Sequence, residues 1–229
     1  YFQSKADMNV SPTPDKIITV GIVPKNILIN FCNYRDDVNI KEGCSLRFNY
    51  LDGVDVTEKE KTYNILIATS ASIEDSVKII NFAYEALKEE KYTSVFRSHP
   101  LVSHEKLKQK LDYKLGDKLK LSKNRDVKTD LTKSDILIYT MTNLCLEALV
   151  YGVPIIYADI DDFYDSDPLF ECSYLKWLVH DKKELKHAVS QIYGMSSAEF
   201  EKQYCLARKY LQDYFLPVTD KHLEEFVKH

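Results

Sequence analysis

The sequence predicts an α/β protein with a mostly parallel sheet and helices on both faces. From residue 63 onward, short apolar runs alternate with longer amphipathic stretches. Strands that alternate with helices form βαβ units with right-handed crossovers, which build parallel sheets. The composition agrees, because 45% hydrophobic and 29% charged residues in a chain of 229 are typical of folded domains and not of disordered, collagen-like or coiled-coil chains.

Charge, hydropathy and cysteine content narrow the function classes. Lys and Arg number 31 and Asp and Glu 35, a net charge of −4, which argues against duplex nucleic acid as the main partner. No apolar run reaches the roughly 20 residues of a transmembrane helix. The five cysteines are dispersed without a C-x-x-C pair, a pattern that indicates reduced thiols in a cytoplasmic protein and not disulfides or a metal site.

The first 62 residues are expected to lead into the main domain. Residues 1–4, YFQS, resemble the end of a cleavable purification tag and are excluded from the fold. Residues 16–30 are apolar and β-branched around Gly21 and Pro24, which predicts two short extended segments joined by a turn. The polar stretch 32–62 predicts irregular structure. We therefore expect a lead-in or linker over 5–62 and the main domain over 63–229.

The main domain begins with a predicted strand at 64–69. Ser72, with Asp75 three residues later, resembles a capping box that opens a helix to about residue 90. Apolar residues at helical spacing give that helix one buried face. The same patterns predict further strands at 94–98, 118–122, 135–140 and 153–158, and helices at 105–111, 126–133, 143–151, 181–193 and 196–214, with a last helical segment after Pro217.

In parallel α/β sheets, ligands bind at the carboxyl ends of the strands. The polar residues that follow the predicted strands are Ser70, Ser72, His99, Ser122, Lys123 and Thr140 to Asn143, with Asp159 onward. We interpret the acidic run 159–167 as a solvated loop and helix start. The lysines between 114 and 128 read as a solvated strand face, in which Ser122 and Lys123 are candidates to contact a base.

Residues 97–100, Arg-Ser-His-Pro, form the first candidate cluster. Pro100 restricts its own backbone and biases His99 toward an extended conformation. A stiff backbone at a strand end would aim the imidazole at a bound ligand. The alternative is a surface histidine before a turn.

The second cluster is Thr140, Thr142 and Asn143, between a strand and a helix. These residue types are ordinary helix caps, which suffices to explain one of them. However, the helix contains no carboxylate before Glu147, so its positive end is left for an anion such as a phosphate. Glu147 itself lies in an apolar helix and needs a partner, which could be a pair of sugar hydroxyls or a lysine. Gly152 is expected to stop the helix.

Together these motifs resemble a known family. R-x-H-P at 97–100 and S-D-I-L-I-Y-T-x-T-x-x-x-x-E-A-L-x-x-G-x-P-I-I-Y at 134–157 resemble the C-terminal, nucleotide-binding half of GT-B glycosyltransferases. The likeness is to bacterial surface-polysaccharide enzymes: capsule and Kdo transferases, sialyltransferases and teichoic-acid transferases. Residues 43–51 resemble the stretch that links the two halves. The resemblance implies a Rossmann-like half of a GT-B fold followed by C-terminal helices.

The resemblance also implies site residues and chemistry. It implies a metal-independent transfer from a nucleotide-activated sugar, CMP- or CDP-linked with UDP as the alternative, without a cofactor, and gives the catalytic role to His99, as a hydrogen-bond donor or an imidazolium. The implied contacts are His99 with Thr140 or Thr142 for the phosphates and Glu147 for the ribose. From their positions, Arg97 and Asn143 are further candidates for the phosphates, and Ser122 and Lys123 are further candidates for the ribose or base. Thr-Met-Thr stands where Ser-Ser is common in the family, so either threonine could face the phosphate. Ser70 and Ser72 remain further candidates.

The family resemblance leaves partners and rival functions to be tested. It implies a glycan or lipid-linked acceptor, bound through an N-terminal half missing from the sequence, in the cytoplasm at the inner face of a bacterial membrane. We find no convincing general base in the sequence. A sugar-nucleotide epimerase of the same fold and a non-catalytic α/β interaction module stay open as alternatives.

Overall fold

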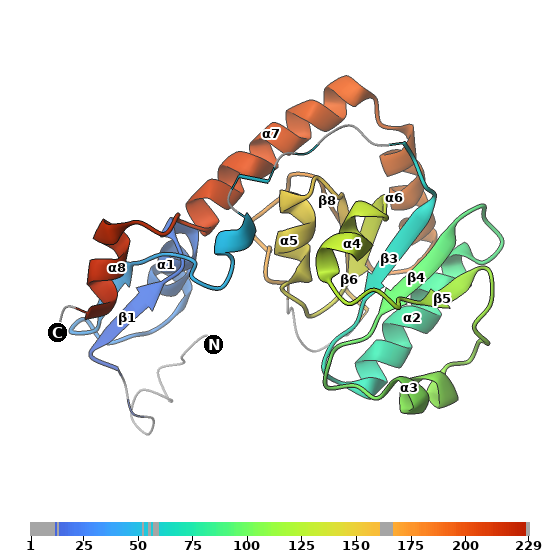
Figure 1. Cartoon of the computed structure of the whole chain (residues 1–229), viewed down its shortest axis with the longest axis horizontal. Coiled ribbons are helices and arrows are strands. Elements are labelled where there is room, and N and C mark those ends of the chain that lie inside the picture. The colour runs from blue at the N-terminus through green and yellow to red at the C-terminus, as the bar shows by residue number, and fades with distance from the viewer. Residues whose placement is uncertain are drawn as a thin grey trace. The chain divides into compact units, whose positions relative to one another are not determined.

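A computed structural model describes residues 12, 14–51, 53–54, 56, 60–160 and 167–227. The chain forms two compact units, one of Tyr1–Val54 with Arg208–His229 and one of Asp55–Ala207 (Figure 1). The predicted tag at residues 1–4 lies outside the described residues. The structure thus divides the chain at different places from the expected boundary between 62 and 63, and each unit is described separately below.

The larger unit contains a six-stranded sheet in which every paired strand is parallel. Its strands are β3 (Asn64–Ala68), β4 (Thr93–Arg97), β5 (Leu119–Leu121), β6 (Ile136–Tyr139), β7 (Ile155–Ala158) and β8 (Lys176–Val179). Their order is β5-β4-β3-β6-β7-β8. The chain therefore builds outward from β3 in one direction, returns to the other side of β3, and builds outward again, so that the strand order reverses between β3 and β6.

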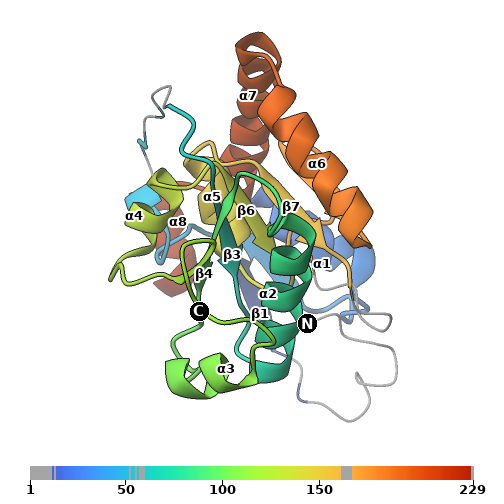
Figure 2. The same ribbon diagram turned by 90° about the vertical axis from the view of Figure 1, so that its right-hand side faces the viewer.

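Among the described residues, six helices belong to or begin in this unit. They are α2 (Ile73–Leu87), α3 (His104–Lys110), α4 (Val127–Thr132), α5 (Leu144–Val150), α6 (Lys182–Gly194) and α7 (Ser197–Tyr214). Figures 1 and 2 show α2 and α6 on one face of the sheet and α4 and α5 on the other. The predicted α/β class, with a mostly parallel sheet covered on both faces, is confirmed.

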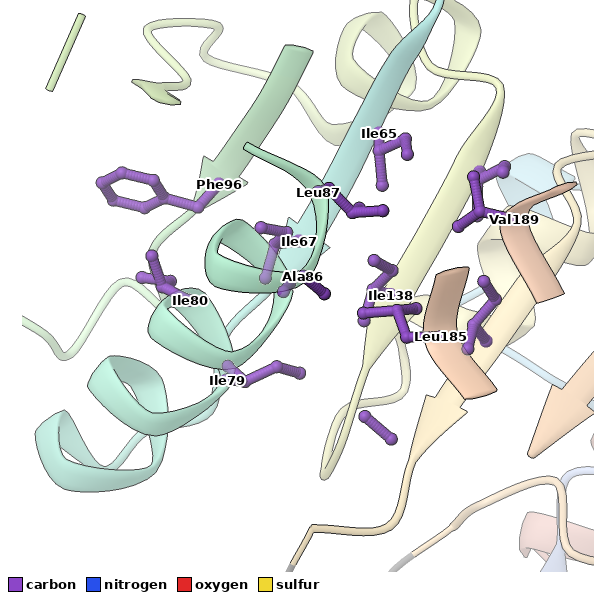
Figure 3. Packing of buried hydrophobic residues seen from close by; sticks show 14 of the residues in the cluster. Ile65, Ile67, Ile79, Ile80, Ala86, Leu87, Phe96, Ile138, Leu185 and Val189 are labelled. Carbon is purple, nitrogen blue, oxygen red and sulfur yellow. The ribbon is translucent and has the colours of Figure 1, made fainter. Parts of the chain in front are cut away.

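Side-chain alternation along the strands explains the two layers. Ile65 and Ile67 of β3 belong to a buried cluster with Ile79 and Leu87 of α2 and Leu185 of α6, as Figure 3 shows. Successive strand residues point to opposite faces of a sheet.

The residues between these positions build the opposite layer. Leu66, Leu137 and Tyr139 are fully buried but lie outside that cluster. The other face is packed against α5, which contacts both β6 and β7. Burial on both faces explains why these strands read as continuous apolar runs and not as alternating ones.

Capping side chains fix where the helices start. The Ser72 hydroxyl accepts the Asp75 N–H at 3.2 Å, and Glu74 and Asp75 occupy the first turn of α2, which confirms the predicted start. Asp181 accepts the N–H groups of Lys183 and Glu184 at 2.8 Å at the start of α6. These carboxylates offset the positive end of each helix dipole.

The strand β8 was not predicted. It follows a loop whose residues 161–166 lie outside the described part of the chain, and its sequence KWLV offers only four residues. A strand this short, at the edge of the sheet, is specified by pairing with β7, where Ile155 faces Lys176 and Ala158 faces Val179. Pairing between distant segments carries no local sequence signal.

The smaller unit corrects the expectation for residues 16–62. It contains β1 (Lys16–Thr19), α1 (Ile22–Phe31), β2 (Asn39–Glu42), a short 3-10 turn at Asn49–Leu51, and α8 (Asp220–Val227). Strands β1 and β2 pair in parallel. Residues 22–31 are thus a helix and not an extended segment, because Pro24 falls in the first turn, where no backbone N–H is needed.

The C-terminal segment completes this smaller unit. Leu216 donates its N–H to Val20, and Ser45 donates its N–H to the Leu216 carbonyl at 3.1 Å. Phe48 and Phe215 pack with their ring centroids 4.9 Å apart. A Cβ on Gly21 would lie 2.2 Å from the Tyr214 carbonyl oxygen, so only glycine allows this close approach. The described residues from 14 to 51 therefore fold with the C-terminal segment into one unit.

No helix in the described ranges is both long and apolar enough to cross a lipid bilayer.

Candidate functional site

The carboxyl ends of β3, β4 and β6 lie side by side at the point where the strand order reverses. Ala68 pairs with Arg97, and Ile67 pairs with Ile138, so these three strands end at nearly the same level. In open α/β sheets this switch point is where ligands bind. The residues directly after the three strands are therefore the natural candidates for a site.

Thr69 joins the first two of these strand ends, a role that sequence reasoning missed. Its hydroxyl donates to the Arg97 carbonyl at 3.2 Å and accepts the His99 N–H at 3.0 Å. Thr69 is only 4% exposed, so these bonds form in a protected environment and hold well. The backbone at His99 is fixed by β3 as well as by Pro100.

The His99 ring has a defined orientation. Its Nδ1 accepts the Leu101 N–H at 3.2 Å, so Nδ1 carries no proton and the neutral ring carries its proton on Nε2. The side chain is half-buried. With Nδ1 accepting from Leu101, the ring presents Nε2–H as its hydrogen-bond donor.

The Arg97 side chain is bonded to partners within the fold. Its guanidinium pairs with Asp130 at 2.5 Å and donates to the carbonyl oxygens of Asn124, Arg125 and Asp126 at 3.1–3.4 Å. A guanidinium has five N–H donors in a rigid fork, and most of this one is engaged within the fold. Arg97 therefore ties β4 to the segment after β5.

Asp130 is the centre of that arrangement. It is 3% exposed and also accepts hydrogen bonds from the Ser122 hydroxyl and the Asn124 amide, both at 2.6 Å. The Ser122 hydroxyl in turn accepts the Asn124 N–H at 3.2 Å. Ser122 is thus part of the support beneath the segment, whereas Lys123 is exposed and stays available to a ligand.

The turn after β6 carries Thr140, Thr142 and Asn143. Thr140 is 8% exposed, and the Thr142 hydroxyl accepts the Leu144 N–H at 3.3 Å, so Thr142 caps α5 while its own proton remains a donor. Asn143 is exposed, and its side chain makes no capping bond. The hydroxyls predicted at this edge are therefore present there, and the first acidic residue of α5 is Glu147.

A buried thiol holds the same turn from within. Cys145 donates to the Thr142 carbonyl at 3.1 Å, and burial is the main reason that its pKa is raised. The thiol therefore stays protonated and keeps donating. Cys145 has a structural role here, in line with the expectation of reduced thiols.

Glu147 lies on the buried part of α5 and is 9% exposed. It has partners within the fold, and its charge helps to raise the pKa of Tyr151, although burial of the phenol is the larger cause. Gly152 ends the helix as predicted, with φ at +65°. The N–H groups of Gly152 and Val153 donate to the carbonyl oxygens of Leu149 and Ala148. This is the Schellman arrangement, which favours glycine.

Ser70 and Ser72 are occupied by the start of α2. The Ser70 hydroxyl accepts the Ser72 N–H at 3.1 Å, and Ser72 caps the helix at Asp75. The acidic first turn of α2 makes this helix start a poor place for an anion. These two serines lie at the predicted edge, but their hydroxyls serve the backbone.

The end of the acidic run 159–167 is not solvated as expected. Residues 161–166 lie outside the described ranges, but Asp167 is 7% exposed. It forms an ion pair with Lys176 and accepts the Tyr139 hydroxyl at 2.8 Å. A buried carboxylate with these partners is structural. Asp159, by contrast, faces His180 at 3.3 Å near the surface.

Comparisons with known proteins support the fold. No protein-family model matches the chain, and a search of curated proteins found no match. Among solved structures, a glycosyltransferase from Rickettsia africae is 13% identical with a TM-score of 0.63, covering 99% of this chain and 66% of its own. TarM is 14% identical with a TM-score of 0.59, covering 96% of this chain and 44% of its own.

A third solved structure is the pneumococcal O-GlcNAc transferase GtfA in complex with UDP and GlcNAc. It is 14% identical with a TM-score of 0.55, and covers 97% of this chain and 46% of its own. The chain thus spans about half the length of TarM and GtfA. At this identity the likeness concerns the fold alone: the chain shares the fold of GT-B-type glycosyltransferases, with a six-stranded parallel sheet as its Rossmann-like part.

Proposed function

We propose that the chain is the donor-binding part of a glycosyltransferase that takes a nucleotide-activated sugar. One observation carries this proposal most directly. The strand order reverses between β3 and β6, and His99, Thr140 and Thr142 all follow strand ends at or beside this point. Hydrogen-bond donors at the switch point of a parallel sheet suit the phosphates of a nucleotide.

The polar groups have complementary roles in this proposal. The Nε2–H of His99 and the hydroxyls of Thr140 and Thr142 donate to the donor phosphates, with Asn143 beside them. Glu147 accepts from the ribose hydroxyls, and Lys123 lies at the base end. Net charge does not supply phosphate affinity, because the chain carries −4. Local geometry must therefore supply it.

In the proposed reaction, the bond between the anomeric carbon and the phosphate oxygen breaks and the nucleotide leaves with the electron pair. The acceptor hydroxyl forms the new bond to that carbon and gives up its proton to a base. Donors aimed at the leaving phosphate stabilise the charge that develops on it. We propose this transfer without a metal ion or cofactor, the base being supplied by the rest of a two-domain enzyme.

The identity of the nucleotide and that of the acceptor are two narrower parts of the proposal. The sequence motifs favour CMP or CDP, whereas GtfA and a TarM mutant were solved in complex with UDP. TagF is a wall teichoic acid polymerase, with a TM-score of 0.50 and 16% identity. The likeness to TagF supports a role in surface-polysaccharide synthesis. We further propose a glycan or lipid-linked acceptor and a place in the cytoplasm at the inner face of the membrane.

Calorimetric titration of the chain with UDP, CDP and CMP tests the proposal. We expect saturable binding of at least one nucleotide, together with a rise in melting temperature, since a ligand that binds only the folded state stabilises it. Absence of binding by all three at millimolar concentration would overturn the proposal. It would favour a non-catalytic module, which predicts no nucleotide-dependent shift.

Product analysis separates the transferase from the epimerase alternative. The chain is incubated with a UDP-sugar, and the sugar is analysed by NMR. A transferase part releases nucleotide slowly or leaves the donor intact, whereas an epimerase inverts a sugar carbon while the nucleotide stays attached. Accumulation of an epimeric UDP-sugar would reject the transferase.

A further inference from the structure

Asp130 lies at the centre of a cluster of polar side chains at this edge of the sheet. Its members are Asp130, Arg97, Ser122 and Asn124, and it holds the carbonyls of residues 124–126. The cluster joins the strand end of β4, which leads to His99, to the segment that follows β5. Strands β4 and β5 are neighbours in the sheet.

The cluster contains more charge and more directed bonds than the local fold needs. A short segment after a strand can be held by backbone bonds alone, as where Ser122 donates its N–H to Phe96 at 2.8 Å. Here a carboxylate that is 3% exposed is desolvated as well, which is costly unless every lone pair has a partner. Such a group gives a single, well-defined geometry to what surrounds it.

The cluster fixes two stretches of backbone that lie on neighbouring strand ends. Arg97 and His99 are two residues apart, and the backbone between them is pinned by Thr69 at the His99 N–H and at the Arg97 carbonyl. On the other side, Asp130 fixes Ser122 and Asn124 on either side of the exposed Lys123. The cluster therefore sets the spacing between the predicted phosphate ligand, His99, and the segment at the predicted base end.

We infer that Asp130 and Arg97 are positioning residues for the nucleoside end of the donor, with Arg97 acting through the segment 122–126 and not on the phosphate. This inference rests on the proposed function. It predicts different effects on nucleoside-containing ligands and on phosphate-only ligands, whereas direct phosphate binding by Arg97 would predict a loss for both. Loss of Asp130 should weaken ligands that contain a nucleoside and spare those that contain only phosphate.

The test compares variants by titration with UDP or CDP, the corresponding nucleoside, and inorganic pyrophosphate. For Asp130→Asn we expect the dissociation constants of nucleotide and nucleoside to rise about tenfold, while that of pyrophosphate changes less than about twofold. For Arg97→Lys, which keeps a cation beside Asp130 but loses the planar fork, we expect the same pattern at smaller size. Asp117→Asn, an exposed carboxylate before β5, is the matched control.

Amide hydrogen exchange, measured without ligand, distinguishes a local effect of the substitution from general unfolding of the variant. Amide exchange in Asp130→Asn should accelerate at residues 122–126, while the amides of β3 and β6 stay protected. Exchange that accelerates throughout the sheet would show a general structural role and overturn the inference. If Asp130→Asn does not fold, Arg97→Lys decides by the same two measurements.

The outcomes separate the inference from the proposed function. If the unmodified chain binds no nucleotide, the proposed function and the inference both fail. If it binds nucleotide and Asp130→Asn binds all probes as tightly as before, the inference alone is wrong. If Arg97→Lys weakens pyrophosphate as much as nucleotide, Arg97 is a direct phosphate ligand and the inference is likewise overturned.

Discussion

At the scale of single residues, His99 offers the sharpest test of the site, because its two ring nitrogens have different partners. Nδ1 accepts the Leu101 N–H, and Nε2–H is left to donate. In asparagine the side-chain oxygen takes the place of Nδ1, and in glutamine the amide nitrogen approximates the place of Nε2. The two substitutions therefore remove the two functions one at a time.

We expect His99→Asn to preserve the turn and to weaken the binding of nucleoside diphosphates about tenfold, since it lacks the donor proposed to face the phosphate. His99→Gln should keep more of that affinity, and His99→Ala should lose it while the bare nucleoside binds nearly as before. Titration of each variant with UDP and with uridine measures this. Equal losses for nucleotide and nucleoside would reject a phosphate role for His99.

The buried pair of Asp167 and Lys176 is a second residue-scale test, this time of stability. Removing one member of a buried ion pair leaves the other uncompensated, which typically costs about 3–5 kcal/mol. We expect a loss of that order in the free energy of unfolding for Asp167→Asn, measured by urea denaturation. Tyr139→Phe, which removes one hydrogen bond to Asp167, should cost only about 1–2 kcal/mol.

Asp117→Asn again provides the control, because Asp117 is exposed and its substitution should change the free energy of unfolding by less than about 0.5 kcal/mol. A destabilisation of Asp167→Asn no larger than that of the control would contradict the buried pair.

These residues also show why the site could be predicted only in part. His99, Thr140 and Thr142 were found because they stand next to strand ends, which is a local property. Asp130 and Asp167 were missed because their partners are far along the chain: Arg97 is 33 residues from Asp130, and Tyr139 is 28 residues from Asp167. Their roles arise only when the sheet forms.

At the scale of elements, the turn after α5 is constrained both in backbone conformation and in space. Gly152 has φ at +65°, and a Cβ there would lie 2.8 Å from the Val56 side chain. A non-glycine residue in this conformation costs about 1–2 kcal/mol, and the contact adds to it. We expect Gly152→Ala to lower the free energy of unfolding by at least that amount in urea denaturation.

Gly116→Ala is the matched control, because its Cβ would meet nothing within 4 Å and its φ is not in the left-handed region. We expect this variant to be neutral or slightly stabilising. Equal effects of the two substitutions would mean that the helix end does not depend on the conformation of Gly152.

Elements within the larger unit followed the sequence closely, for a physical reason. The predicted runs at 64–69, 94–98, 118–122, 135–140 and 153–158 overlap five of the six strands. The central strands β3, β6 and β7 are buried on both faces and apolar, whereas β4 and β5 alternate between more and less buried residues, and both patterns are local sequence signals. The prediction failed where apolar character does not specify the element. The apolar residues of 22–31 suit a strand as well as a helix, and β8 is defined by its pairing with β7.

At the scale of the whole molecule, the structure divides the chain into two units that sequence order does not reveal. The smaller unit joins residues from both ends of the chain, and contacts across so long a separation leave no periodic signal. The larger unit carries all of the candidate site residues. The division therefore explains why local patterns do not reveal which residues belong to each unit.

The whole chain should also lose stability at alkaline pH, through tyrosines buried in the larger unit. Burial, with smaller contributions from neighbouring acidic groups, raises the pKa of Tyr139 beside Asp167 and of Tyr193, whose hydroxyl donates to Asp135 at 3.2 Å. In the unfolded chain these phenols lose their protons near pH 10. Above that pH the folded state binds more protons than the unfolded state, so the free energy of unfolding falls as the pH rises.

We expect this loss to approach about 1.4 kcal/mol per pH unit for each phenol that stays protonated in the folded state, measured by urea denaturation at several pH values between 8 and 11. Tyr139→Phe should be less stable at pH 8 but show a shallower decline above pH 10, because one of the linked protons is gone. Gly116→Ala introduces no titrating group and should keep the original slope. A decline with the same slope in Tyr139→Phe would place the alkaline sensitivity elsewhere in the chain and remove Tyr139 as its cause.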